Sequence, residues 1–458
     1  MPGFHLPSED EFDPSTDDFV LRSISKERNY KHFDLPLSEI ERDSQVDFRS
    51  EKKPHRFWPL LGFTDLSRRY VRVKEKDGSW KKNTHGKFVR EEIVKPRPIR
   101  YAGHEDAAYL QAYAMHLNSF YEQALIIDGS TSSVLAYRKG GGTNIHHAKL
   151  LFDEITSRGD CTVFAMDISG FFDCLDHKML RDEVAGLIGV ERLDGHHGRV
   201  WKNITKYSWV ETDDLDKLLG QKRNGHGRVC SPQDYTAHVQ GRKGGLVRKH
   251  DLDYGIPQGT PVSGLYANIY LRTFDREMIA LCAQYGGSYR RYSDDIAVVL
   301  PFGAKVQHVV AVVEKLLADH RLAMSVAKTE TAAFKGGSLV SPKPIQYLGF
   351  TFDGHHTLIR PSSIDAYLGK MRSGIHAKLI AAKMQNIPSA NVYQRELRSR
   401  YTHAGKRRNF IRYAHRSADI MGSAEIKRQV KSHQAWFDRA WNDEIERVYG
   451  GLVTTSDR

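Results

Sequence analysis

The sequence predicts an α+β fold in which an antiparallel sheet packs on helices and a helical region follows it. Two apolar runs rich in branched and aromatic residues, Cys161–Met166 and Ile296–Leu300, predict strands of a buried sheet. A pair of carboxylates directly precedes the second run, and a basic and aromatic stretch before that pair predicts a neighbouring strand. From Ile364 onward the apolar residues recur at helical spacing.

The carboxylate pair lies within the stretch Arg290–Leu300. We expect Arg290–Tyr292 to lead into a tight hairpin at Ser293-Asp294, after which Asp295 opens the apolar strand. Uncompensated carboxylates beside a buried strand are costly, and a divalent cation such as Mg²⁺, which prefers oxygen ligands, compensates them. The alternative is a solvated Asp-Asp turn that binds no ion.

A second carboxylate upstream favours the cation. The apolar run that begins at Cys161 ends in Asp167, and Phe171-Phe172 begin the segment that follows. Two strand-borne carboxylates from distant segments can share a pair of metal ions. Metals about 4 Å apart clamp the attacking and leaving oxygens of a phosphoryl transfer. The pattern therefore favours metal-dependent phosphoryl transfer.

Three segments resemble, in this order, the A, B and C motifs of reverse transcriptases. They are Asp167–Phe172, Gly255–Ser263 and Tyr292–Asp295. The similarity extends from about Arg56 to Lys370 and implies a right-hand polymerase fold with fingers, a palm and a helical thumb. In one departure, Gly264 follows Ser263 where the family usually has proline, which leaves the start of the next helix open.

The resemblance divides the chain into four parts. Residues 1–55 form an acidic N-terminal arm and residues 56–155 form the fingers. Residues 156–358 form the palm, with an insertion at about 181–250 whose Gly/Arg/Lys-rich stretches predict basic loops. Residues 359–458 form a helical, basic thumb.

The resemblance assigns the chemistry to three carboxylates. It implies that Asp167, Asp294 and Asp295 are catalytic and that these residues together with Ile168 hold two Mg²⁺ ions, with Mn²⁺ as a substitute. One metal lowers the pKa of the primer 3′-hydroxyl and the other holds the triphosphate. Asp295 assists electrostatically or from behind the metal ligands.

Four further residues are expected to contact the incoming nucleotide. The guanidinium of Arg97 suits the triphosphate, and the ring of Phe172 excludes a 2′-hydroxyl, which favours dNTPs. Gln258 probes the new base pair, and Lys328 protonates the leaving pyrophosphate. An ordinary surface strand at Arg97 and a surface lysine at Lys328 remain the alternatives.

Other residues are expected to contact nucleic acid. Two cations precede a glycine run that suits phosphate, a second segment resembles the primer-grip hairpin, and a cationic triplet is interleaved with aromatic residues. In that order they are Arg138 and Lys139, then Tyr347, Leu348 and Gly349, then Lys406, Arg407 and Arg408.

The distribution of charge predicts a polyanionic partner. The net charge is +12, but the first 50 residues hold twelve acidic against six basic residues and so carry −6, which leaves +18 on the remainder. Residues 361–458 alone hold 18 basic and nine acidic residues, a net +9. A basic body of this kind attracts nucleic acid, whereas the alternative is a generic solubilising surface.

Cysteine usage and hydropathy restrict the cellular setting. The four cysteines form no CxxC pair and no disulfide framework, which fits a reducing cytosol and argues against a zinc module. No apolar run approaches the roughly 20 residues of a membrane span, and the polar, acidic N-terminus does not resemble a secretory signal. We therefore expect a cytoplasmic protein with no membrane partner.

The segments 95–101 and 347–370 look most like bacterial defence-associated reverse transcriptases of the formerly unknown-group class, which are related to retron and group II intron enzymes. This resemblance implies phage defence, with a structured non-coding RNA as template, dNTPs as substrates and DNA as product. A retron-type enzyme making RNA-linked DNA is one alternative, although the characteristic Val-Thr-Gly tripeptide is not found. A catalytically silent RNA-binding scaffold of polymerase fold is another. The oligomeric state stays open.

Overall fold

The computed structural model describes most of the chain. The described residues are 30–38, 41, 54–75, 77–84, 86, 88–138, 140–220, 227–241, 244–325, 329–405 and 409–450. Helices and an antiparallel sheet are combined as the sequence predicted, which confirms the α+β class.

A five-stranded sheet lies at the centre of the fold, with the strand order β6-β7-β3-β8-β9 and antiparallel pairing throughout. Its strands are β3 (Cys161–Asp167), β6 (Ser288–Tyr292), β7 (Asp295–Pro301), β8 (Glu330–Lys335) and β9 (Ser338–Leu339). The two apolar runs of the sequence are thus the neighbouring strands β3 and β7.

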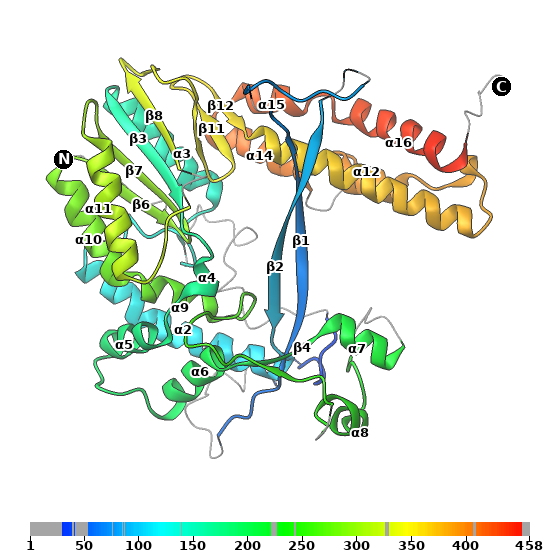
Figure 1. Ribbon diagram of the computed structural model, residues 1–458, viewed down its shortest axis with the longest axis horizontal. Helices are drawn as coiled ribbons and strands as arrows, with labels where there is room; N and C mark the ends of the chain where they lie inside the picture. Colours follow the sequence, from blue (N-terminus) through cyan, green and yellow to red (C-terminus); the bar gives the residue numbers. More distant parts are fainter. Residues whose placement is uncertain are drawn as a thin grey trace.

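Helices cover both faces of this sheet (Figure 1). Along β3, Phe164 and Met166 belong to the core that includes α10 (Arg272–Gln284) and α11 (Val306–Asp319). The intervening Val163 and Ala165 belong to the core that includes α3 (Asn144–Arg158). Because successive side chains of a strand point to opposite faces, a sheet covered on both sides requires a continuous apolar run. Burial of each such side chain contributes about 1.5–3 kcal/mol.

A second layer of helices extends the first core below the sheet in Figure 1. It contains α2 (His104–Ile127), α5 (His177–Ile188), α6 (Gly195–Thr205) and α9 (Ser263–Tyr270). Every residue of α9 is buried, so this helix is enclosed on all sides. The short α4 (Phe171–Cys174) connects this layer to the end of β3.

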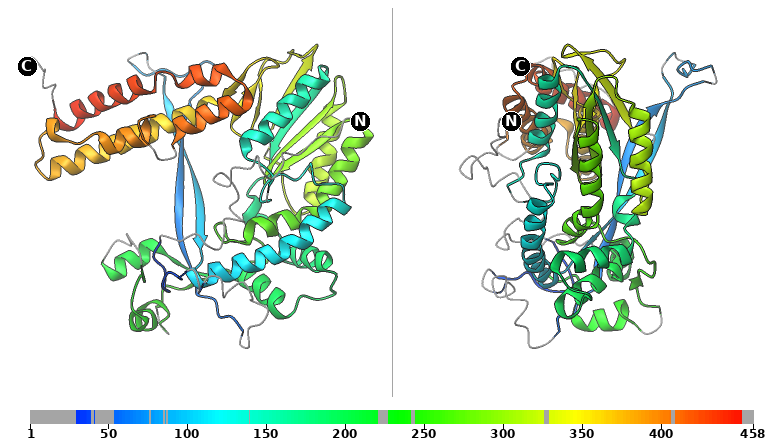
Figure 2. Two further views of the ribbon diagram at one scale, coloured as in Figure 1. Left: turned by 180° about the vertical axis from the view of Figure 1, so that it is seen from behind. Right: turned by 90° about the vertical axis from the view of Figure 1, so that its left-hand side faces the viewer.

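A long two-stranded ribbon projects from the helix layer, as the right-hand view of Figure 2 shows. It consists of β1 (Leu60–Arg72) paired antiparallel with β2 (Arg90–Tyr101). At its base β1 also pairs in parallel with β4 (Ser208–Glu211), which in turn pairs with β5 (Arg248–Lys249).

The segment 181–250, expected to be an insertion with basic loops, therefore joins the sheet of the N-terminal ribbon. Besides α6, β4 and β5 its described residues form α7 (Thr212–Leu219), α8 (Pro232–Asp234) and the π-helix Tyr235–Val239. A small third core holds this arrangement together, since Phe33 of the N-terminal arm packs with Leu61 and Val210. Part of the acidic arm is thus docked on the body.

The C-terminal region is helical, as predicted, and follows a small antiparallel sheet. That sheet consists of β10 (Ile345–Tyr347), β11 (Phe350–Phe352) and β12 (Thr357–Ile359). The helices are α12 (Pro361–Met384), α13 (Arg395–Tyr401), α14 (Phe410–Met421), α15 (Ala424–Val430) and α16 (His433–Tyr449), with a 3₁₀ turn at Ser389–Asn391. The long helices α12 and α16 pack along each other (Figure 1). Among the described helices, none is both long enough and apolar enough to cross a bilayer.

Candidate active site

The three predicted carboxylate residues lie at the same end of the five-stranded sheet. The antiparallel register of β3 and β7 places Asp167 opposite Asp295. The backbone N–H of Ile168 donates to the carbonyl oxygen of Asp294 at 3.0 Å, so the hairpin is hydrogen-bonded to the chain that leaves β3. All three carboxylate residues are half-buried. Ile168 has a buried apolar side chain, so only its backbone carbonyl could ligate a cation.

The hairpin between β6 and β7 is tight, and surrounding contacts fix its conformation. Ser293 takes a left-handed backbone conformation, with φ 59°, between β6 and β7. Its side chain is buried, and its Oγ lies 3.0 Å from the hydroxyl of Tyr137. A residue with a Cβ is strained in this conformation, so surrounding contacts must hold the turn in place.

Arg291 supplies the strongest of these contacts. Its guanidinium is 0% exposed and forms a two-point ion pair with Asp275 of α10, at 2.8 and 2.6 Å. Nη1 also donates to the carbonyl oxygen of Ser293 at 3.1 Å and to Oδ1 of Asn268 in α9 at 3.0 Å. Burial opposes the charge of Arg291, but the Asp275 carboxylate overcomes that effect and raises the pKa of the guanidinium. One buried cation thus ties the turn to two helices.

Tyr137 links the hairpin to Phe172 and to the departure at Gly264. The rings of Tyr137 and Phe172 meet edge to face, with centroids 6.4 Å apart. A Cβ at Gly264 would lie 2.7 Å from Cδ1 of Tyr137, which leaves no room for a side chain there. A proline at this position, as in the resembled family, would overlap that ring. The helix α9 still begins at Ser263.

Backbone hydrogen bonds of the segment Gly255–Ser263 hold Phe172 and Gln258 in the same region of the structure. The N–H of Ile256 donates to the carbonyl oxygen of Phe172 at 2.8 Å. Two residues on, the carbonyl oxygen of Gln258 accepts from the N–H of Arg100 on β2 at 2.7 Å. A Cβ at Gly259 would lie 2.7 Å from the carbonyl oxygen of Arg100, so only glycine permits this crossing.

Arg97 lies three residues before Arg100 on the same strand. It faces Asp65 across the ribbon, and its side chain is exposed. The ribbon thus presents an exposed guanidinium on the strand that contacts Gln258.

Arg138 has an internal role instead of the phosphate contact that the sequence predicted. Its guanidinium forms a two-point ion pair with Glu122, the shortest distance being 2.7 Å, and donates to the carbonyl oxygen of Val134 at 2.8 Å. Its side chain is only 11% exposed. Because these partners inside the protein engage the N–H donors of the guanidinium, Arg138 stabilises the loop that carries Tyr137.

The segment expected to form the primer grip is a tight hairpin between β10 and β11. Leu348 and Gly349 form the turn, with φ 46° and 92°. The carbonyl oxygen of Leu348 accepts from Nδ2 of Asn144 at 3.1 Å, and the same amide donates to Tyr413 of α14. Burial raises the pKa of Tyr347, with a smaller lowering by Arg290 and a smaller raising by Asp295. The side chain of Tyr347 is buried, whereas Leu348 and Gly349 in the turn are partly exposed.

Five of the predicted residues lie outside the described part of the chain. They are Lys139, Lys328, Lys406, Arg407 and Arg408. The described residues just before Lys328 adjoin the site, since the N–H of Ser325 donates to the carbonyl oxygen of Asp167 at 2.8 Å.

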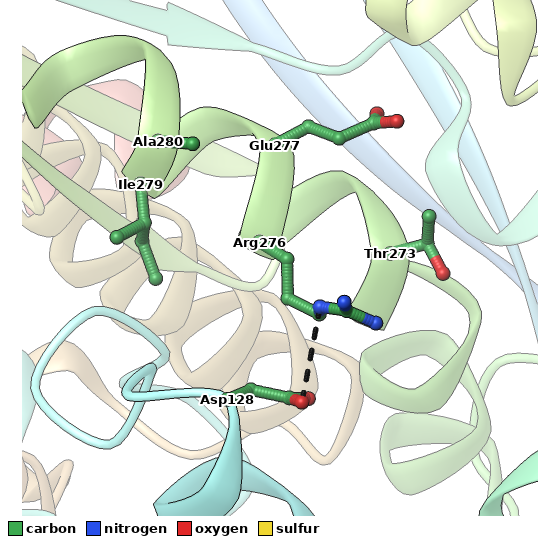
Figure 3. Close-up of a pocket in the computed structure, with 6 residues that line it drawn as sticks. All are labelled: Asp128, Thr273, Arg276, Glu277, Ile279 and Ala280. Carbon is green, nitrogen blue, oxygen red and sulfur yellow. Dashed lines mark ion pairs between the residues drawn. The ribbon is translucent and has the colours of Figure 1, made fainter. Parts of the chain in front are cut away.

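A separate pocket lies between the end of α2 and α10 (Figure 3), and none of the predicted site residues lines it. Asp128, Thr273, Arg276, Glu277, Ile279 and Ala280 line it. Nε of Arg276 lies 3.8 Å from Oδ1 of Asp128 across it. None of these residues belongs to the carboxylate hairpin or its neighbours.

Sequence reasoning missed the residues that hold the hairpin. Arg291 was assigned only to a strand, and Tyr137, Asn268 and Asp275 received no role. One signal was present: with alternate residues of a strand facing the core, Tyr289 and Arg291 share a face, and a cation on a buried face requires a buried anion.

Replacing Arg291 with alanine should lower the free energy of unfolding by about 3–5 kcal/mol, because Asp275 then stays buried without its cation. Urea unfolding followed by circular dichroism measures the change. Arg276→Ala is the matched control, since this arginine also pairs with an aspartate but is 59% exposed, and it should cost about 1 kcal/mol or less. Equal losses in the two variants would contradict the structural role of Arg291.

Comparison with known proteins identifies the family. Curated protein sequences give no match. Among solved structures, the fold is similar to apo telomerase from Candida tropicalis, with 11% identity, a TM-score of 0.38, and coverage of 88% of this chain and 65% of that chain. It is also similar to telomerase from Candida albicans in complex with the TWJ fragment of telomeric RNA, with 13% identity, a TM-score of 0.37, and coverage of 90% and 66%.

This chain spans less than two thirds of those telomerase chains. The sequence profile described as reverse transcriptase (RNA-dependent DNA polymerase) matches residues 95–352, which is more than half of the chain. The protein therefore belongs to the reverse transcriptase family.

Proposed function

We propose that the protein is an RNA-directed DNA polymerase that adds dNTPs to a primer by two-metal nucleotidyl transfer. The observation that carries this proposal is the register of β3 and β7, which sets Asp167 opposite Asp295 at the open end of a buried sheet. Three carboxylates in one place are costly unless cations compensate them. The family match supports the reaction class.

The donor set fits a hard divalent cation. The side chains of Asp167, Asp294 and Asp295 offer only oxygen, as does the carbonyl of Ile168, and oxygen donors suit Mg²⁺ with Mn²⁺ as a substitute. Two such ions, when bound, activate the primer 3′-hydroxyl and neutralise charge on the triphosphate. No histidine or sulfur ligand is needed for this role.

The remaining assignments concern what the side chains do around the carboxylates. Arg291 and Ser293 hold the hairpin in one conformation, so the carboxylates need not rearrange when the substrate binds. Phe172 excludes a 2′-hydroxyl, Gln258 contacts the new base pair, and Arg97 meets the triphosphate from the ribbon. Lys328 is proposed as the acid for the pyrophosphate.

A structured non-coding RNA is the proposed template, and antiviral defence in a bacterial cytoplasm is the proposed setting. The +18 charge of the body beyond residue 50 supports an RNA partner. The resemblance of residues 95–101 and 347–370 to defence-associated enzymes supports the non-coding RNA template and the defence setting. A retron-type activity would give DNA covalently joined to RNA, and co-purified nucleic acid distinguishes the two. A silent RNA-binding scaffold is disfavoured because all three carboxylates are present.

Replacing both Asp294 and Asp295 with alanine should lower the rate of dNTP incorporation by at least about a thousandfold, because several kcal/mol of charge stabilisation are lost. Extension of a primed RNA template with labelled dNTPs and Mg²⁺ measures the rate. Asp319→Ala removes an exposed carboxylate from the end of α11 and should leave the rate unchanged. Undiminished extension by the double variant, or none by the unmodified protein on any primed RNA, would refute the polymerase.

Phe172→Ala should reduce the preference for dNTPs over rNTPs by about tenfold to a hundredfold, because the ring no longer blocks a 2′-hydroxyl. The ratio of kcat/KM for dGTP and rGTP on the same template measures it. Phe302→Ala, which removes an exposed ring after β7, is the control. If the ratio stays the same in the Phe172 variant, this residue is not the sugar gate.

The affinity for single-stranded RNA should fall by about a thousandfold or more between 50 and 200 mM salt if six or more phosphates are contacted. Fluorescence anisotropy at a series of KCl concentrations gives the slope. A peptide nucleic acid of the same base sequence, which has no phosphates, is the control and should show a flat response. A shallow slope for RNA would contradict binding through a basic surface.

A further inference from the structure

Three histidines gather where α6 meets α2, remote in sequence from the carboxylate hairpin. They are His116 of α2 and the adjacent pair His196 and His197 at the start of α6. One ligand atom from each lies within 4.8 Å of the corresponding atom of the other two. The ring centroids are 4.1 Å apart for the adjacent pair and 6.2 to 6.3 Å from His116 to each of them. Among the described residues, these three side chains lie close enough together to hold an ion.

The neighbouring side chains complete an arrangement typical of histidine metal ligands. The hydroxyl of Tyr113, one turn before His116, lies 3.1 Å from Nδ1 of His197. The hydroxyl of Tyr266 donates to that of Tyr113 at 3.4 Å. A ligating histidine usually engages its second ring nitrogen with a polar partner, which fixes the ring and leaves the other nitrogen for the metal. Tyr113 supplies that partner when His197 binds through Nε2.

We propose that His116, His196 and His197 bind one divalent transition-metal ion of the Zn²⁺ class. Imidazole nitrogen favours Zn²⁺, Co²⁺, Ni²⁺ or Cu²⁺ over the Mg²⁺ that suits the carboxylates. With Zn–N distances of 2.0–2.1 Å, tetrahedral donors lie about 3.4 Å apart, so these nitrogens need to approach by at most about 1.4 Å. Small rotations of the imidazole rings supply that movement.

Such an ion would join two parts of the chain that are 80 residues apart. His116 belongs to a helix whose buried residues share the main core with β3 and β7. The pair lies in the segment 181–250, whose strand β4 also anchors the β1–β2 ribbon. Both helices lie in the layer below the sheet in Figure 1. The ion would fasten the base of the ribbon to the layer that supports the carboxylates, and this role does not depend on polymerase activity.

The test uses the full-length chain stripped of metal with a chelator. Titration with Co²⁺ in excess Mg²⁺, which keeps the carboxylates occupied by the hard ion, should produce visible d–d absorption bands that saturate at one Co²⁺ per chain. Zn²⁺ should then bleach these bands by displacement. Zn²⁺ at a hundred times its Kd should raise the unfolding free energy by about 2.7 kcal/mol, seen as a higher melting temperature. Absence of the bands in the unmodified protein overturns the proposal.

Variants separate the site from adventitious histidine binding. His116→Asn with His196→Asn should weaken Co²⁺ binding by at least about a hundredfold, and Tyr113→Phe by about tenfold or more, because partners of metal ligands contribute that much. The matched control is His355→Asn with His356→Asn, another adjacent pair, which is exposed and should leave the bands unchanged. Should the double variant fail to fold, His116→Asn alone carries the test. Bands that persist in a folded His116 variant, or that vanish in the control, overturn the assignment.

Discussion

The antiparallel pairing of β3 with β7 is the constraint on which the rest of the structure depends. Each strand is buried on both faces, and its residues alternate between two cores. A slip of one residue would send every side chain to the opposite core, so the packing of the two cores enforces a single register. That register is what sets Asp167 opposite Asp295. The position of the carboxylates is therefore a result of apolar packing, and the polar site itself contributes little to choosing it.

Pairing alone does not fix the turn between β6 and β7, and a buried cation completes it. Arg291 reaches from the strand to Asp275 and Asn268 on two helices and to the carbonyl of Ser293. An ion pair without solvent is weak evidence of net stability, because desolvating both charges offsets most of their attraction. The ion pair of Arg291 and Asp275 matters here for the geometry of the turn. It allows one conformation for a turn that holds a strained serine, and so it keeps three carboxylates in a defined arrangement.

The sequence was informative where one physical rule acted alone. Continuous apolar runs identified β3 and β7, and helical spacing identified the C-terminal helices. The positions of Asp167 and Asp295 followed from motif order. The roles of those carboxylates remain predictions. Sequence reasoning failed where contacts between residues far apart in the chain determine the structure. The pairing of β4 with β1 depends on a three-residue contact across about 150 positions, and Arg138 was assigned to phosphate because Glu122 could not be recognised as its partner. The proximity of His116 to the histidines of α6 likewise depends on the packing of helices that are 80 residues apart.

The contact between Gly264 and the ring of Tyr137 restricts which residues position 264 can accept. A tyrosine at position 137 and a proline at position 264 would overlap, since even a Cβ at 264 would lie against the ring. Any side chain at position 264 would have to displace that ring, and with it the hydroxyl beside Ser293. The small size of one residue in a buried helix thus sets how closely a neighbouring tyrosine approaches the carboxylate hairpin.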